Sequence, residues 1–134
     1  MSPRFLLDTH ILVHWLSAQK KLSREQLRVL REAVRHREPV AISAITLLEI
    51  AVLFGEGHTR AKAPTDELFN QLELNPALHI VPFTVEIAVE VAAIGGALRD
   101  PADRAIVCTA RVHGFRLITS DRRIIDSNLV PIVI

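Results

Sequence analysis

One stretch near the N-terminus, residues 4–16, reads RFLLDTHILVHWL. A short apolar run ends here at Asp8, and apolar residues then recur at the spacing of a helix. We therefore predict a buried strand over residues 4–8 and a helix over residues 9–16. The apolar face of that helix combines Ile11, Leu12, Trp15 and Leu16. A buried strand that passes directly into a helix is typical of a parallel sheet covered by helices.

The rest of the chain repeats this alternation of short apolar runs and helical patterns. Further strands are predicted at residues 40–42, 79–83, 115–119 and 130–134. Further helices are predicted at residues 23–37, 43–54, 65–74, 84–96 and 103–113, with a polar loop at 56–64 and a short helical turn at 121–126. The sequence therefore predicts one α/β domain over residues 1–134, with a mostly parallel sheet of about five strands and helices on both faces.

Two of these helices carry predictions about packing. In the helix at 23–37, Ser23 and Gln26 have the spacing of a capping box, and the predicted apolar stripe is Leu27, Leu30 and Val34. The helix at 84–96 is rich in alanine and valine, which predicts burial.

Composition limits the class of protein. Of 134 residues 49% are hydrophobic, which supplies a core and argues against disorder. The net charge of +1 gives no strong global attraction for nucleic acid, so such a partner needs a local basic patch. The single cysteine, Cys108, excludes an intrachain disulfide and is expected in the core. No apolar run spans a membrane and Met1 to Arg4 lead straight into a strand, so we expect a cytoplasmic protein.

Four acidic residues lie next to apolar runs, at Asp8, Glu49, Asp103 and Asp121. Carboxylates in such places are costly unless a partner neutralises them. In a parallel sheet all four can reach the crevice at the carboxyl ends of the strands, where ligands bind. Oxygen-only ligands suit Mg²⁺, with Mn²⁺ as an alternative, rather than zinc or iron.

Each acid also has an alternative explanation. Asp8 can cap the helix that follows it, and Asp100-Pro101-x-Asp103 is a normal helix start with an acid in the first turn. Asp121 fits a strand-to-helix turn. Glu49 is harder to explain, because its helical neighbours at three and four residues include no lysine or arginine. Its alternative explanation is a helix edge that is exposed to solvent. A buried Glu49 would have a raised pKa unless a cation faced it.

Four short motifs follow one another along the chain. They read Leu7-Asp8-Thr9-His10, Ser43-x-x-Thr46-x-x-Glu49, Asp100-Pro101-Ala102-Asp103-Arg104 and Thr119-Ser120-Asp121. In this order and spacing they resemble the motifs of PIN-domain proteins, especially the toxin ribonucleases of VapBC toxin–antitoxin modules. The resemblance covers essentially the whole chain. It implies a three-layer α/β/α PIN-like fold, Mg²⁺-dependent hydrolysis of RNA phosphodiesters, a homodimer, and a cognate antitoxin that holds the toxin inactive.

The resemblance also implies roles for single residues. The acidic quartet is Asp8, Glu49, Asp103 and Asp121, with Asp8 and Asp103 as direct metal ligands. Asp103 matches the third acid of the family because it directly precedes the Ala-Ile-Val-Cys-Thr-Ala helix. Residues expected to support the ligands are Thr9, Ser43, Thr46, Asp100 and Thr119. Candidates for RNA phosphate contacts are Arg104, Arg122 and Arg123.

Other classes of protein fit less well. A phosphoacceptor receiver domain needs an acidic pair after the first strand, and an Asp-x-Asp phosphatase needs an acid where this chain has His10. A zinc site at His10 and His14 is disfavoured because the glutamate of the zinc-protease motif is missing. A non-catalytic PIN-like module that binds RNA or protein stays open as the alternative function. Trp15 is a candidate anchor for an antitoxin helix, provided that it is not fully buried.

Overall fold

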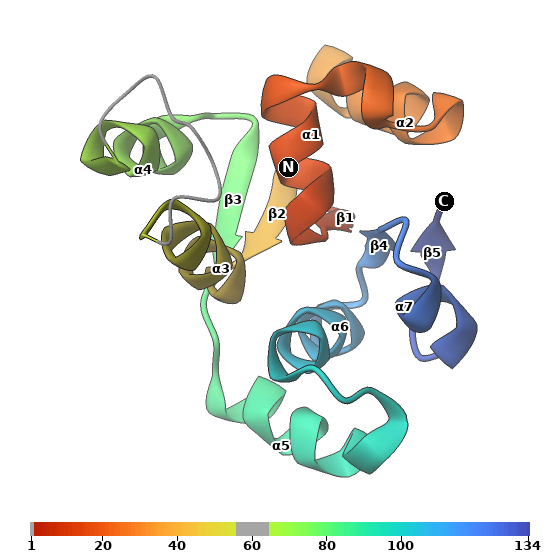
Figure 1. Cartoon of the computed structure of the whole chain (residues 1–134). Helices are drawn as coiled ribbons and strands as arrows, with labels where there is room; N and C mark the ends of the chain where they lie inside the picture. The colour runs from red at the N-terminus through yellow and green to blue at the C-terminus, as the bar shows by residue number, and fades with distance from the viewer. Residues whose placement is uncertain (1, 56–64) are drawn as a thin grey trace.

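A computed structural model describes residues 2–55 and 65–134 of the chain. Its centre is a five-stranded sheet in the order β3-β2-β1-β4-β5 (Figure 1). The strands are β1 (Phe5–Leu7), β2 (Val40–Ser43), β3 (Leu78–Val81), β4 (Arg116–Ile118) and β5 (Ile132–Val133). All neighbouring strands of this sheet run parallel, which confirms the predicted sheet and makes it more uniform than expected. The predicted loop at 56–64 lies outside the described residues.

The sheet separates two apolar clusters. Because side chains alternate between the faces of a strand, Leu7, Ile42 and Ile118 enter one cluster. Leu6, Ala41 and Leu117 enter the other. Helices contribute to both clusters, and the strands β1 and β2 are buried along their whole length.

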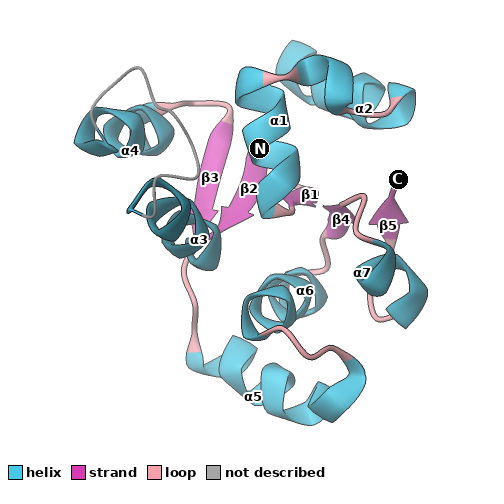
Figure 2. Ribbon diagram, in the orientation of Figure 1, coloured by secondary structure: helices cyan, strands magenta, loops and turns pink. Residues whose placement is uncertain are grey.

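Helices lie on both sides of the sheet (Figure 2). The first face is covered by α1 (Thr9–Ser17), α2 (Arg24–Arg35), α3 (Ala44–Gly55) and α4 (Thr65–Leu74). The second face is covered by α6 (Pro101–His113) and α7 (Arg122–Ser127), and α5 (Val85–Ile94) packs on α6. Short 3-10 turns are η1 (Gln19–Lys21) and η2 (Gly95–Ala97). The expected three-layer α/β/α arrangement is confirmed.

The predicted burial of the helix at 84–96 is wrong. In α5 the side chains of Val85 and Val89 are 82% and 64% exposed, whereas Ile87 is fully buried. The reason is positional: α5 packs on α6 rather than on the sheet, so its outer face has no neighbour within the described residues. Alanine and valine content indicates that a helix can be buried, but not which layer it joins.

The predicted packing of the helix at 23–37 is partly right. Ser23 and Gln26 form the capping box as predicted. The buried face, however, holds Val29, Leu30 and Ala33 together with Gln26, while Val34 is 53% exposed. Leu16 of α1 is likewise half exposed. Apolar spacing predicted the helix correctly, but the face of α2 that packs against the sheet is rotated from the predicted one.

Most element boundaries agree with the predictions within two residues. The helix expected at 103–113 begins at Pro101, because Asp100 is its N-cap. The strands expected at 79–83 and 130–134 are shorter, at Leu78–Val81 and Ile132–Val133. Cys108 is buried in α6 as predicted. Among the described residues, no helix combines the length and the apolar character needed to cross a membrane.

Candidate active site

The chain changes direction in the sheet between β1 and β4. From β1 it proceeds outward through β2 to β3, whereas β4 leads to β5 on the other side. Ligands bind at such a switch point in parallel α/β sheets. A cleft of about 320 Å³ lies at the carboxyl ends of these strands. It is lined by Asp8, Thr9, His10, Val13, His14, Glu49, Leu53, Asp100, Asp103, Asp121 and Arg123. All four acids of the predicted quartet therefore share one cleft.

Asp8 follows β1 directly and is 4% exposed. One of its carboxylate oxygens accepts the Thr9 N–H at 2.9 Å, and this contact caps α1. The other oxygen accepts the Thr119 hydroxyl at 2.7 Å. Asp8 is thus a helix cap and a cleft residue at once, so the two explanations of this acid are compatible.

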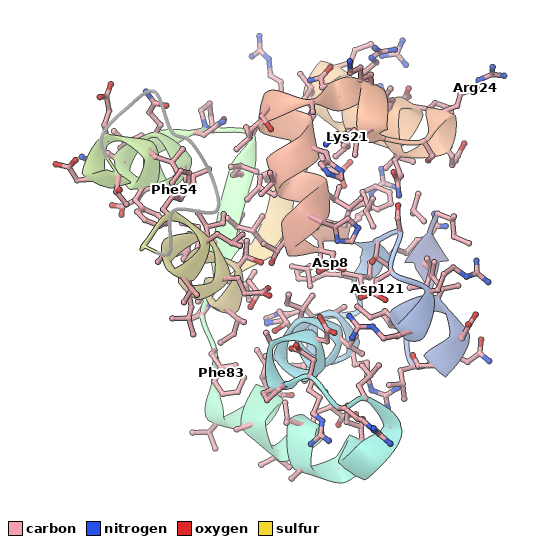
Figure 3. The ribbon with its side chains drawn as sticks, in the orientation of Figure 1. Asp8, Lys21, Arg24, Phe54, Phe83 and Asp121 are labelled. Carbon is pink, nitrogen blue, oxygen red and sulfur yellow. The ribbon has the colours of Figure 1, made fainter. Side chains whose placement is uncertain are left out.

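Thr119 connects two of the acids. Its Oγ1 donates to Asp8 and accepts the backbone N–H of Asp121 at 3.1 Å. Asp121 in turn accepts the backbone N–H of Arg123 at 2.9 Å, and the Arg123 guanidinium donates to its other oxygen at 2.8 Å. The hydrogen bonds from Arg123 lower the pKa of Asp121. Figure 3 shows Asp8 and Asp121 facing the same region between α1 and α7.

Glu49 reaches the cleft from α3 and is half-buried. Thr9 Oγ1 donates to Glu49 Oε1 at 2.5 Å and lies 3.0 Å from the hydroxyl of Thr46. Burial raises the pKa of Glu49, and the charges of Asp8 and Asp100 raise it further. This direction agrees with the prediction for an acid that has no basic helical neighbour.

Asp103 lies in the first turn of α6 and its side chain is 13% exposed. The Asp100 carboxylate caps the helix by accepting the Asp103 N–H at 3.0 Å. Burial raises the pKa of Asp103 to about 6, with further contributions from Asp100, Asp8 and Asp121. The Arg123 guanidinium, 3.5 Å from Asp103 Oδ2, opposes this shift. Unneutralised negative charge is therefore concentrated around Asp103.

The remaining predicted residues divide into two groups. Ser43 lies at the end of β2 and accepts the Ile45 N–H at 3.1 Å, so it shapes the start of α3 rather than lining the cleft. Of the three candidate arginines, Arg123 lines the cleft. The other two point to different partners, since Arg104 donates to the Leu98 carbonyl and Arg122 pairs with Asp126 at 3.2 Å.

Two contributors, His10 and Gln26, were not among the site residues predicted from the sequence, although His10 belongs to the first of the four motifs. His10 Nε2 accepts the Ser120 N–H at 3.1 Å, and its Nδ1 lies 3.3 Å from Asp8 Oδ2, so the imidazole spans the loops after β1 and β4. Its place two residues after Asp8 was a usable signal. Gln26 is fully buried, and its side-chain amide donates to Ser120 Oγ at 3.0 Å. Only its capping role was visible, because the second contact is nearly a hundred residues away in the chain.

The donor set fits a hard divalent cation. Four carboxylates of one cleft offer oxygen donors, and burial together with the neighbouring negative charges raises the pKa of Asp103. Within residues 2–55 and 65–134, no three His, Cys, Asp or Glu side chains stand close enough to enclose an ion. The carboxylate chemistry of the cleft suits Mg²⁺ rather than a structural zinc site, which is built from Cys and His.

The comparison with protein families identifies the class. The PIN domain model matches residues 5–127, and the chain belongs to the PIN-domain family. It is 36% identical over 124 residues to Ribonuclease VapC22 of Mycobacterium tuberculosis, covering 89% of this chain and 88% of the relative. FitAcB from Neisseria gonorrhoeae has the same fold, with a TM-score of 0.70 and 24% identity over 97% of this chain and 96% of that chain. A toxin–antitoxin complex from Klebsiella pneumoniae matches with a TM-score of 0.62 and 25% identity, over 96% and 95% of the two chains.

Proposed function

We propose that this chain is a single PIN domain that hydrolyses RNA phosphodiesters as the toxin of a type II toxin–antitoxin module. The observation that carries this proposal is the convergence of Asp8, Glu49, Asp103 and Asp121 in one cleft at the switch point of the sheet. The similarity to a VapC ribonuclease supports the same proposed function. The alternative function is a non-catalytic PIN-like module that binds RNA or protein.

The proposed chemistry depends on how the residues of this chain hold their carboxylates. When bound by the quartet, Mg²⁺ or Mn²⁺ would acidify a water and stabilise charge on the leaving oxygen. Thr119 and the start of α1 fix both oxygens of Asp8, and Thr9 fixes one oxygen of Glu49. Asp8 and Asp103 are the proposed direct ligands, with Glu49 and Asp121 holding a second ion or ordered waters. Removing hydrogen bonds of this kind typically lowers the metal affinity or the activity about 10–100-fold.

Partners follow from the same proposal. We expect an RNA substrate, a cognate antitoxin, a homodimer and a cytoplasmic location. Trp15 is half-buried and packs at the edge of the apolar cluster on the α1 side of the sheet, so it meets the condition set for an antitoxin anchor.

The test is cleavage of structured and single-stranded RNAs with Mg²⁺, with Mn²⁺, or with EDTA. The wild-type protein should cut RNA only with a metal ion present. Asp8→Asn and Asp103→Asn should each reduce the rate by at least about 100-fold, since both remove a proposed ligand. Thermal unfolding gives a second readout, because Mg²⁺ should raise the Tm of the wild type and not of Asp8→Asn.

Two results would contradict the proposal. Equal cleavage by wild type and both variants indicates a contaminating nuclease. Tight RNA binding without cleavage under any metal condition supports the non-catalytic alternative.

A further inference from the structure

The exposed face of α2 carries a regular line of cations. Arg24, Arg28, Arg31 and Arg35 are all exposed and are spaced by four, three and four residues. At 3.6 residues per turn they fall within an arc of about 60°, and the row extends over roughly 16 Å. The buried residues of α2, which include Val29 and Ala33, lie on the opposite side of the helix. We call these four residues the arginine row; they line a shallow groove of about 390 Å³ together with Glu32.

Acidic residues neutralise only part of the row. Glu25 pairs with Arg28 at 2.5 Å, and Glu32 pairs with Arg35 at 2.8 Å. Within the described residues, Arg24 and Arg31 have no acidic partner closer than 4.0 Å. Lys20 and Lys21 extend the positive charge toward α1. Residues 20–35 thus hold six Lys and Arg against two acids, in a chain whose total charge is only +1.

Contacts on the buried face of α2, opposite the arginine row, connect this helix to the acidic cleft. Gln26, in the first turns of α2, donates to the hydroxyl of Ser120, and the N–H of Ser120 is bound by His10 of the cleft. Lys21 adds a positive charge near His14, whose pKa is lowered by burial first, then by His10 and by Lys21. Figure 3 shows Lys21 beside α1, whereas Arg24 lies at the outer end of α2 and extends away from Asp8 and Asp121.

A nuclease with this cleft needs cations elsewhere. Five acids line the cleft and repel a polyanion, so phosphates outside the scissile position must supply the affinity. Arginine carries a permanent positive charge, which attracts the phosphates of an RNA strand whatever its sequence. We propose that the arginine row binds the phosphate backbone of an RNA strand that extends beyond the cleft; this rests on the proposed ribonuclease function. The preferred substrates are therefore long or structured RNAs rather than short oligonucleotides.

The test compares Arg24→Gln/Arg31→Gln with Arg24→Lys/Arg31→Lys, each combined with Asp8→Asn so that RNA stays intact. All three residue types are good helix formers, so the fold should be retained, and circular dichroism checks this. The probes are labelled polyuridylates of about 20 and about 4 nucleotides. Binding is measured by fluorescence anisotropy over a series of salt concentrations.

We expect the glutamine pair to weaken binding of the long probe roughly 5–10-fold, with a salt slope smaller by about 1.4, or 0.7 per lost phosphate contact. The lysine pair should bind the long probe within about twofold of the parent, because the charges remain. The short probe should bind equally well to every protein.

Three results would overturn the inference. Unchanged binding of the long probe by the glutamine pair removes the role of the row. Equal weakening by the lysine pair indicates a structural effect instead of phosphate binding. If the glutamine pair binds RNA as the parent does but binds a polyglutamate peptide more weakly, the arginine row binds an acidic protein instead of RNA. If the glutamine pair weakens RNA binding but the wild type cuts no RNA, the proposed activity fails and the binding surface remains.

Discussion

At the scale of single residues, the four acids of the cleft are stabilised unequally. Asp8 and Asp121 accept hydrogen bonds from Thr119 and Arg123, respectively, and Arg123 lowers the pKa of Asp121. Glu49 and Asp103 are half-buried, and both pKa values are raised by burial. Burial is the largest cause of the raised pKa of Asp103, and the charges of Asp100, Asp8 and Asp121 add to it.

This difference predicts a pH effect on the metal-free protein. An acid whose folded-state pKa is raised destabilises the fold once it ionises, so stability falls as pH rises from 3.8, the ordinary value, toward about 6. Asp103→Asn should therefore gain stability relative to wild type between pH 4 and pH 7, by on the order of 1–2 kcal/mol after allowance for solvent screening. Urea unfolding in EDTA at several pH values measures this difference in the free energy of unfolding between Asp103→Asn and the wild type. A difference that does not change with pH contradicts the assigned environment of Asp103.

A second prediction concerns the Thr119 hydroxyl. Thr119→Val keeps the volume but removes the hydrogen bonds to Asp8 and Asp121, which leaves polar groups buried without partners. We expect a loss of about 1–3 kcal/mol in the free energy of unfolding and roughly 10–100-fold weaker Mg²⁺ binding. Thr119→Ser is the control, because it retains the hydroxyl. Calorimetry and denaturant unfolding check both, and equal losses in the two variants would show that packing rather than hydrogen bonding matters.

At the scale of elements, the cleft is built from the starts of three helices. Asp8 caps α1, Asp100 caps α6 and Asp121 caps α7. Each N-terminus carries unpaired N–H groups and positive potential, which stabilise nearby carboxylates. The preference of helix N-termini for an acidic capping residue therefore also places an acid at the cleft in each of these three helices.

Asp100 and Asp103 can be separated by substitution at the start of α6. Asp100→Asn keeps an N-cap acceptor, so it should leave stability unchanged and RNA cleavage within a few-fold of wild type. Asp100→Ala should cost about 1 kcal/mol through the lost cap. Thermal unfolding and cleavage assays on both variants measure this, with Asp103→Asn for comparison. A loss of cleavage in Asp100→Asn as large as in Asp103→Asn would make Asp100 a ligand.

At the scale of the whole molecule, the order of the strands determines where charge gathers. Because β1 lies between β2 and β4, residues near both ends of the chain meet at one crevice. Negative charge collects there, and positive charge collects on the exposed face of α2. The small net charge of +1 conceals this separation.

The exposed face of α5 predicts the oligomeric state. Val85 and Val89 form an exposed apolar surface, and we expect a second copy of the chain to cover it in the homodimer that the PIN resemblance implies. Light scattering should give twice the chain mass of 14.9 kDa for the wild type, and the chain mass for Val85→Arg/Val89→Arg. Val34→Arg, at an exposed position of α2, is the control and should stay dimeric. A monomeric wild type, or a double variant that stays dimeric, would contradict the prediction.

The sequence by itself determined the features that obey local rules. The strand and helix positions follow from apolar spacing, and the caps at Ser23, Asp8 and Asp100 follow from residue type. It also marked the four acids, because carboxylates beside apolar runs are costly. Each of these signals depends on neighbours within a few residues, so no tertiary information was needed.

The tertiary structure alone decided which of these signals meet. The bonds from Thr119 to Asp8 and from Gln26 to Ser120 join residues about a hundred positions apart. The order of the strands also brought Arg123 of α7 into the same cleft as Asp8 and Glu49. Which face of α2 is buried, and which face of α5 stays exposed, likewise depends on the layer that each helix joins. Such choices reflect packing between distant segments, and local spacing carries no information about them.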